Sequence, residues 1–258
     1  MEEWTGLAFV LRIGHFRETD LWVRLLLPDK GVLTAFAFGG SKSIRRLPGC
    51  LDVLNTLECH IRQSPRGPFY ILKEASLIKG PKNLRTNWQH LGIASNCIRF
   101  LEVMGTPEDN APEIFSLMEN VRYTLDEGRV ISSLFPWFFR FHLASLQGYV
   151  PGLSSCTACG TPLKQDIAFF HVDEGQVLCR DCAVHTPSHR TPHTQIPIHA
   201  RALLLLNTVA HTLPTAWSHY DSLSPQERQE CSQVIDNFIE YHLGIVWKKG
   251  VLQKTGSL

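Results

Sequence analysis

Four of the eight cysteines in this chain of 258 residues form two Cys-x-x-Cys pairs, and this pattern constrains the fold more than any other sequence feature. The pairs are Cys156 with Cys159 and Cys179 with Cys182, and residues 160–178 lie between them. Two residues between cysteines allow both thiolates of a pair to face one ion, and an insert of hairpin length brings the second pair round to complete a tetrahedron. The spacing therefore predicts a structural Zn2+ site in a small four-cysteine zinc module at residues 154–184.

Redox-active dithiols and unrelated buried thiols are the alternatives, and the spacing favours zinc over both. A zinc ion held by four cysteines has no open coordination position at which to activate water, so the site holds structure and gives poor support for an enzyme. The other cysteines stand singly among apolar residues, and we interpret them as buried thiols: Cys50, Cys59, Cys97 and Cys231.

The composition is that of a globular protein with real cores, because 44% of the residues are hydrophobic and 19% are charged. The formal charge is only +1, so any binding to nucleic acid or membrane must come from local patches. Glu2 and Glu3 precede a short apolar run that Arg12 interrupts, which is the wrong charge order for a secretory signal. No run reaches the roughly 18 apolar residues of a membrane helix, and we expect a cytoplasmic protein.

Five short segments rich in β-branched, aromatic or leucine residues lie within the first eighty residues and predict five strands. Between the second and third, Pro28-Asp29-Lys30-Gly31 is a strong turn signal. Five strands in so short a stretch predict a small barrel at residues 1–80. The expected strands are residues 7–13, 21–27, 32–38, 53–61 and 69–78.

After Gly80-Pro81 the apolar residues recur every three or four positions, which predicts helices and a domain boundary near residue 80. The first expected helix runs from Leu84 to Met104, and the third is an aromatic-rich segment at residues 130–147. The second starts at Asn110, which we expect to act as the cap while Glu113 reaches back.

Residues 183–197 contain three prolines and three histidines and predict an irregular connection, in which a solvated loop is favoured over a second metal site. Helices are expected again at residues 198–212 and 224–243. The latter has Ser224 and Glu227 as a capping box and Gly244 as its stop. The fold class is therefore multi-domain α+β, with the helical domain in two parts, residues 81–153 and 185–258.

Residues 1–80 hold eleven lysines and arginines against eight aspartates and glutamates, a local charge of +3. The cluster of cations after Gly39-Gly40 has two interpretations. It is either a solvated loop with ordinary charges or part of a groove that binds the phosphates of a nucleic-acid backbone. Three aromatic residues offer possible base platforms, although each fits a core equally well: Phe16, Trp22 and Phe38. The candidate contacts to a DNA backbone are Arg12, Arg17, Arg24, Lys42, Arg45 and Arg46.

No nucleophile motif or phosphate-binding loop is present: there is no Gly-x-Ser-x-Gly, P-loop or His-Glu-x-x-His pattern. We therefore name no catalytic residue and expect a protein that is not an enzyme.

Several segments together resemble one family. They are Val10-Leu11-Arg12, Glu18-Thr19-Asp20-Leu21 and Leu25-Leu26 ahead of Lys30-Gly31, then Phe38-Gly39-Gly40-Ser41-Lys42-Ser43, Gln147-Gly148-Tyr149-Val150-Pro151 before Cys156-Thr157-Ala158-Cys159-Gly160, and Gly175-Gln176-Val177-Leu178-Cys179-Arg180-Asp181-Cys182. Through these residues, and over residues 7–245, the chain resembles the RecO family of bacterial DNA-repair proteins, which are recombination mediators.

The resemblance implies that residues 1–80 are an OB-fold DNA-binding domain, followed by a helical domain that carries the zinc module. It also implies binding to single- and double-stranded DNA, annealing of complementary strands, and association with the nucleoid. RecR and single-strand-binding protein are the implied partners in loading RecA. Two features depart from the family pattern: Ile44 and Leu47 stand among the loop cations, and residues 243–249 keep only part of the closing segment.

Two other classes of function remain as alternatives. One is a zinc-stabilised protein-interaction scaffold without direct DNA binding, and the other is a zinc-dependent hydrolase. Binding to a labelled single strand that weakens with salt separates the mediator from the scaffold. A hydrolase requires an open metal position, which four cysteines on one ion do not leave.

Overall fold

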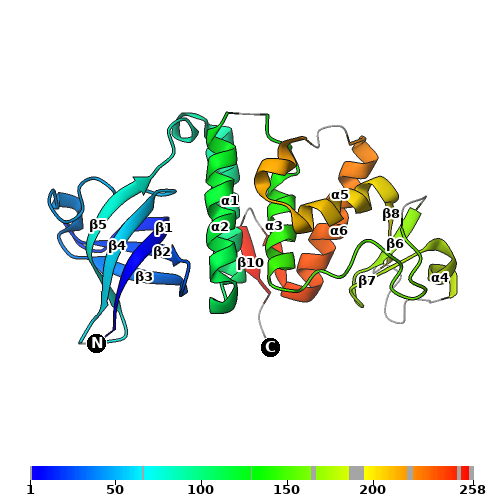
Figure 1. The fold of residues 1–258 in the computed structure, drawn as a ribbon, viewed down its shortest axis with the longest axis horizontal. Coiled ribbons are helices and arrows are strands. Elements are labelled where there is room, and N and C mark those ends of the chain that lie inside the picture. The colour runs from blue at the N-terminus through cyan, green and yellow to red at the C-terminus, as the bar shows by residue number, and fades with distance from the viewer. Residues whose placement is uncertain are drawn as a thin grey trace. The chain divides into compact units, whose positions relative to one another are not determined.

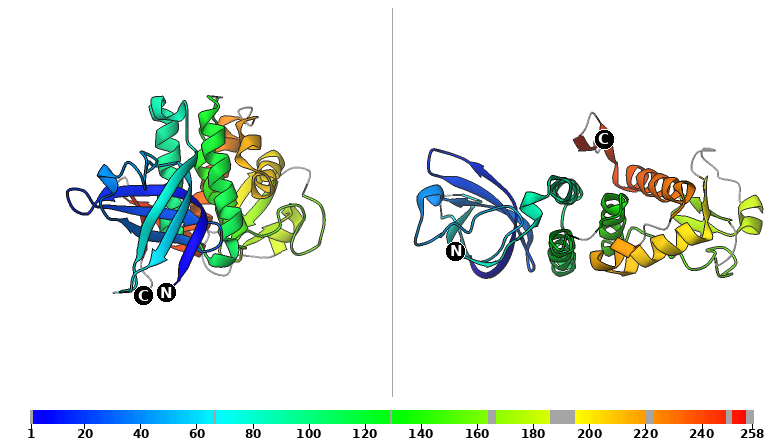
Figure 2. Two further views of the ribbon diagram at one scale, coloured as in Figure 1. Left: turned by 60° about the vertical axis from the view of Figure 1, so that its left-hand side comes forward. Right: turned by 90° about the horizontal axis from the view of Figure 1, so that it is seen from above.

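A computed structural model describes residues 2–65, 67–128, 130–163, 167–185, 195–219, 223–248 and 251–255, with only the backbone described at residues 218 and 219. The chain forms two compact units (Figures 1 and 2). The first contains residues 1–94 and 105–128, and the second contains residues 95–104 and 129–258. The division crosses one long helix, so the two units do not follow the chain in simple order.

The first unit is built on a closed five-stranded barrel with the strand order β1-β2-β3-β5-β4. Neighbouring strands are antiparallel except β3 and β5, which are parallel. This small Greek-key barrel has the OB-fold arrangement and confirms the expected fold. The strands, blue to cyan in Figure 1, are β1 Glu3–His15, β2 Leu21–Leu27, β3 Gly31–Ala37, β4 Thr56–Gln63 and β5 Tyr70–Lys79.

Alternation along each strand decides which side chains fill the barrel. On β2, Leu21, Val23 and Leu25 point into the barrel core, so Trp22 and Arg24 point outward. The register of β1 shifts between Val10 and Arg12, a bulge that lets this long strand bend and pair with both β2 and β4.

The first unit continues past residue 80 because α2 packs on the barrel strands β1 and β2. Its buried Arg122 bonds Glu119 of the same helix and Thr56 of β4, and its guanidinium lies over the Phe9 ring. Sequence periodicity alone does not reveal this packing. The other elements of the unit are the 3₁₀ turns Gly40–Lys42, Leu84–Thr86 and Glu108–Asn110, the start of α1 Trp88–Met104, and α2 Ala111–Asp126.

The predicted capping box at Asn110 is wrong. Asn110 stands at the N-cap of α2, but the described structure shows no capping bond from its side chain. A 3₁₀ turn precedes the helix instead, and the N–H of Ala111 bonds the carbonyl of Glu108. Pro112 lies in the first turn, as expected.

The second unit packs α3, α5 and α6 around a buried aromatic cluster. Trp217 is fully buried against Phe135, Phe138 and His142, and the four phenylalanines of the third predicted helix are core. That helix starts at Phe135, after a turn in which the N–H of Phe135 bonds Ser132, and not at residue 130. The helices are α3 Phe135–Leu146, α5 Ala200–His211 and α6 Pro225–Leu243, with the 3₁₀ helix Pro214–His219.

A three-stranded sheet, with the order β7-β6-β8, follows the first cysteine pair. The irregular connection expected at residues 183–197 is wrong at both ends, because α4 extends to His185 and β8 begins at Gln195. Pro197 fits in β8 because this is an edge strand. His189 and His193 lie outside the described residues. The elements are β6 Ile167–His171, β7 Gln176–Leu178, α4 Arg180–His185 and β8 Gln195–His199.

The capping box of α6 is confirmed: Ser224 accepts from the N–H of Glu227, whose carboxylate accepts from the N–H of Ser224. Gly244 ends the helix with φ of 62°, as expected. A hairpin that the sequence did not predict follows, formed by β9 Ile245–Lys248 and β10 Val251–Lys254. No helix within the described ranges is both long and apolar enough to cross a membrane.

Candidate metal centre and nucleic-acid interface

The four predicted cysteines come together at one point. The Sγ atoms of Cys156, Cys159, Cys179 and Cys182 all lie within 4.8 Å of one another. The Sγ atoms of Cys159 and Cys179 are 3.8 Å apart. Four sulfurs placed about 2.3 Å from a central zinc ion form a tetrahedron with edges of about 3.8 Å, so the set fits this ion.

Backbone hydrogen bonds hold the first pair in a tight turn. The N–H of Gly160 bonds the carbonyl of Cys156 at 2.9 Å, and the N–H of Cys156 bonds Thr161 at 2.8 Å. Gly160 has φ of 75°, a conformation that favours glycine. The N–H of Thr157 bonds Val177 of β7 at 2.9 Å, which joins the first pair to the strand that leads to the second.

The second pair stands where β7 passes into α4. Between the pairs, the N–H of Gly175 bonds the carbonyl of Val172 and closes the turn of the β6–β7 hairpin, so the insert forms the expected hairpin. The cluster has its own small core, in which Leu178 and Ala183 are buried with Cys156. The hairpin brings Cys179 and Cys182 back to the first pair.

Hydrogen bonding distributes protons unevenly over the thiols. Burial would raise the pKa of Cys156, but backbone N–H groups, those of Cys179 and Cys159 foremost, outweigh it and lower the pKa. Bonds from the side chain and backbone of Thr161 lower the pKa of Cys159 to about 6, and bonding to Cys159 raises that of Cys182 to about 12. A divalent cation would take up the thiolates and release the remaining protons.

Contacts within the second unit attach this module to α6. Phe170 of β6 packs edge-on against Phe238, with ring centroids 5.9 Å apart. The Nε2 atom of His242 lies 2.6 Å from the carbonyl oxygen of Val172 in the hairpin turn.

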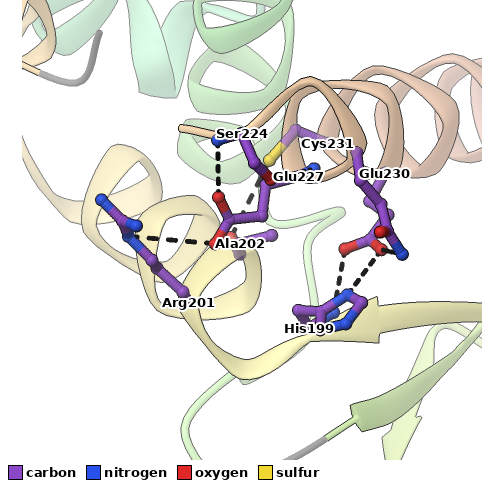
Figure 3. Close-up of polar contacts among 8 residues, drawn as sticks. His199, Arg201, Ala202, Ser224, Glu227, Glu230 and Cys231 are labelled. Atoms are coloured by element: carbon purple, nitrogen blue, oxygen red, sulfur yellow. Dashed lines mark hydrogen bonds and ion pairs between the residues drawn. The ribbon is translucent and has the colours of Figure 1, made fainter. Parts of the chain in front are cut away.

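A third attachment lies where β8 enters α5 (Figure 3). Glu230 of α6 accepts from the backbone N–H of His199 at 3.0 Å, and its Oε1 lies 2.6 Å from the ring Nδ1. One helical turn before Glu230, Glu227 pairs with Arg201 of α5 at 3.9 Å. These contacts attach the sheet of the module to helices α5 and α6, so the role of the module is structural.

A second metal cluster is absent from the part of the chain that the structure describes. His185 is exposed at the end of α4. His171 is fully buried, and neither ring nitrogen has a hydrogen-bond partner among the described residues.

Two of the six candidate DNA-binding cations face each other on the outer surface of the barrel. Arg12 of β1 is the cross-strand partner of Arg24 of β2. Arg24 donates to the Oγ1 of Thr34 on β3 at 3.1 Å, which fixes its guanidinium along the sheet. Arg17 lies in the loop between β1 and β2, with its guanidinium 5.3 Å from the Phe16 ring centroid.

The other three cations lie in the loop after β3. Lys42 ends the 3₁₀ turn Gly40–Lys42 and is exposed. Arg46 donates to the carbonyl of Phe38 at 2.8 Å and to that of Lys73 at 3.4 Å, so it ties the loop to the barrel. Arg45 and Arg46 line a hollow of about 320 Å³, whose walls also contain Glu58 and Glu74. Arg45 and Arg46 therefore lie beside acids. Arg12 and Arg24 lie side by side on neighbouring strands.

Outward-pointing aromatic rings form a cluster that the sequence revealed only in part. The Phe36 ring is 5.3 Å from Phe16, 6.4 Å from Phe38 and 5.7 Å from Phe69. Phe16 and Phe38 were candidate platforms, as was Trp22, the cross-strand partner of Phe36. Phe36 and Phe69 were missed. The position of Phe36 between the inward Ala35 and Ala37 was the available signal.

These features define an OB-fold protein whose helical unit carries a four-cysteine module. Two family models match the chain: Recombination protein O N terminal over residues 1–81, and Recombination protein O C terminal over residues 85–250. A DNA repair protein RecO of Lawsonia intracellularis is 41% identical over 98% of this chain and all of its own length. RecO of Nitratidesulfovibrio vulgaris strain DP4 is 39% identical over 98% of this chain and 99% of its own.

A DNA repair protein RecO of Anaeromyxobacter sp. strain K is similar at 29% identity, over 91% of this chain and 89% of its own length. The chain belongs to the RecO family of DNA repair proteins. This confirms the family expected from the sequence and supports a role in DNA repair and recombination.

Proposed function

We propose that this protein is a non-enzymatic mediator of homologous recombination that binds single- and double-stranded DNA and anneals complementary strands. The observation that carries the proposal is the pair Arg12 and Arg24 on the open face of an OB-fold barrel, next to clustered aromatic rings. Strands β2 and β3 with their adjoining loops are the surface with which OB-folds bind oligonucleotides.

Cations on this face act by neutralising phosphates and releasing counterions, so the binding is independent of sequence. A protein that holds two strands by their backbones leaves the base edges available for pairing. Annealing follows from that arrangement without any catalytic group. In this proposal the backbone contacts are Arg12, Arg17, Arg24, Lys42, Arg45 and Arg46.

The partners in the proposal are DNA, RecR and single-strand-binding protein, with the loading of RecA on coated strands as the outcome. The aromatic third helix and the C-terminal helices are the expected walls for the tail of single-strand-binding protein. A pocket of about 560 Å³ lies there, lined by Trp137, Arg140 and Trp247.

Arg140 gives that pocket its chemistry. Its guanidinium is buried, lies 5.5 Å from the Trp137 ring centroid, and is 3.4 Å from Asp236. Its Nε atom has no partner in the described structure. A cation between aromatic rings suits a peptide that ends in an apolar residue and a carboxylate.

In this proposal the cysteines hold a structural zinc ion, and the protein acts in the cytoplasm at the nucleoid. The module keeps β6–β8 attached to α6, and the DNA contacts belong to the other unit. Measurement of one zinc ion bound by all four cysteines would exclude the zinc-dependent hydrolase, because no position would remain for water.

The test is a fluorescence titration of a labelled single strand over a range of salt concentrations. The double variant Arg12→Gln with Arg24→Gln should lower the slope of log affinity against log salt by roughly 0.7 for each lost phosphate contact. Arg99→Gln, an exposed cation on α1, is the matched control and should leave the slope unchanged. A scaffold without direct DNA binding would show no salt-sensitive binding by the parent protein.

A further inference from the structure

The outer surface of the barrel carries a group of five aromatic side chains at one end. Phe36 lies at its centre, with Phe16, Phe38 and Phe69 around it at centroid distances from 5.3 to 6.4 Å. Trp22 is the cross-strand neighbour of Phe36. This group, named the aromatic platform, consists of Phe16, Trp22, Phe36, Phe38 and Phe69.

Strand register builds the platform. Trp22 and Phe36 occupy outward positions of β2 and β3 and face each other directly. On the other side, β1 has Gly14 opposite Trp22. A Cβ atom on Gly14 would come within 2.4 Å of the indole, so the missing side chain allows the ring to lie on the strand. Loops supply the other three residues: Phe16 just after β1, Phe38 just after β3 and Phe69 just before β5.

The rings of the platform are accessible, whereas another outward-pointing aromatic residue of the barrel, Phe9, is covered. Phe9 of β1 also lies outside the barrel core, and it is fully buried beneath Arg122 of α2. Phe16 and Phe38 are 51% and 41% exposed. No helix of the first unit, as far as the structure describes it, protects these rings as α2 protects Phe9, so their faces are available to a ligand.

The charges beside the platform indicate the chemistry of that ligand. Arg12 and Arg24 occupy the next outward row of β1 and β2, and Arg17 lies over the Phe16 ring. The adjoining loop also holds two acids: Glu18 is exposed, and Asp20 accepts the backbone N–H of Gly39 at 2.7 Å. The three arginines outnumber these two acids. Cations beside ring faces suit a chain of phosphates whose bases are free to stack.

We propose that the aromatic platform is a base-stacking site for unpaired nucleotides, which gives this protein a preference for single strands over duplex DNA. The proposal rests on DNA binding as the proposed function and adds a second kind of contact to it. Phosphates bind the cations on either form of DNA, but only an unpaired strand offers base faces, because a duplex keeps them stacked inside.

The test compares a double variant, Phe16→Ala with Phe38→Ala, with the parent protein. Both rings are exposed, so the barrel core is not disturbed. Loss of base stacking should weaken binding to a labelled thymidine strand at least tenfold. Affinity for a hairpin duplex of the same charge should change less than twofold, and the salt slope on the single strand should not change. Trp88→Ala removes an exposed ring elsewhere and should affect neither affinity.

A second measurement removes the bases in place of the rings. The parent should bind an abasic strand about as weakly as the double variant binds the normal strand, and the variant should not distinguish the two strands. The substitutions Phe16→Leu with Phe38→Leu keep the apolar volume but remove the ring faces, so single-strand affinity should fall here too. Full affinity in the leucine variant would assign the surface to apolar docking and overturn the proposal.

Failure of the two proposals can be distinguished. Salt-insensitive binding by the parent protein would contradict DNA binding itself. If the parent binds both forms of DNA with a normal salt slope while the alanine variant keeps its full single-strand affinity, only the stacking site is refuted. An equal loss for single strand and duplex would also refute it, since duplex DNA has no exposed base faces.

Discussion

Glu230 of α6 holds His199 by two atoms, accepting its backbone N–H at 3.0 Å while Oε1 lies 2.6 Å from the ring Nδ1. Glu230 is only 9% exposed, and Gln226 donates to the same carboxylate at 3.3 Å. His199 is the residue at which β8 ends and α5 begins. The carboxylate thus links the sheet of the zinc module to two helices of its unit.

Glu230→Ala should lower the free energy of unfolding of the second unit by about 1–3 kcal/mol, because a backbone N–H then loses its partner in a part-buried site. Glu240→Ala, an exposed carboxylate on the same helix, is the control and should change stability by less than about 0.5 kcal/mol. Urea denaturation followed by circular dichroism measures both. Equal stability of the two variants would show that the link to His199 contributes nothing.

Loss of the cysteine site should destabilise the second unit without weakening the DNA contacts of the first. Replacing all four cysteines by serine removes the ligands, so we expect a lower melting temperature for the second unit and loss of bound zinc. Binding of the barrel to single-stranded DNA should persist at temperatures below this transition. A quadruple variant that melts like the parent would contradict a structural role for the site.

The loop cations offer a separate test of the DNA surface. The single variants Lys42→Gln and Arg45→Gln should each lower the salt slope of single-strand binding by roughly 0.7 if the residue contacts a phosphate. Arg46→Gln should also weaken the loop, because it removes two bonds to the carbonyls of Phe38 and Lys73. Lys254→Gln, an exposed cation on β10, is the control. An unchanged slope for both Lys42 and Arg45 would exclude the loop from the interface.

Local sequence signals predicted the elements that are determined by residues close together in the sequence. Two segments rich in β-branched, aromatic or leucine residues, with the Pro28–Gly31 turn between them, predicted β2 and β3, and Ser224 with Glu227 predicted the start of α6. The cysteine spacing predicted a metal site that needs only a hairpin to close. In each case the residues that determine the structure lie within a few positions, or one hairpin, of one another.

Features that depend on register or packing were not predictable in the same way. Phe36 and Phe69 lie far apart in sequence and meet because β3 and β5 are parallel neighbours. The assignment of α2 to the barrel unit depends on Arg122 reaching Thr56. The strand β8 is only five residues long and contains Pro197, so its alternation was too short to outweigh the proline signal.

Asp126 at the end of α2 provides a pH-dependent test of the first unit. Its carboxylate accepts the backbone N–H groups of Lys82, Asn83 and Leu84 at 2.7–3.0 Å. Burial would raise the pKa of Asp126, but these bonds outweigh it and hold the pKa below the usual 3.8. Because the folded state favours the ionised form, its contribution is present above about pH 4 and is lost as the pH falls through the folded pKa.

Asp126→Asn should therefore destabilise the first unit by about 1 kcal/mol at neutral pH, a modest value because the group is partly exposed. The difference from the parent should shrink below about pH 4, where the parent carboxylate gains its proton. Glu58→Gln, which removes an exposed carboxylate from β4, is the control and should leave stability nearly unchanged across this range. Urea titrations at neutral pH and near pH 3 measure the three proteins. A difference between parent and Asp126→Asn that is the same at both pH values would mean that the charge of Asp126 is not what holds the turn at residues 82–84.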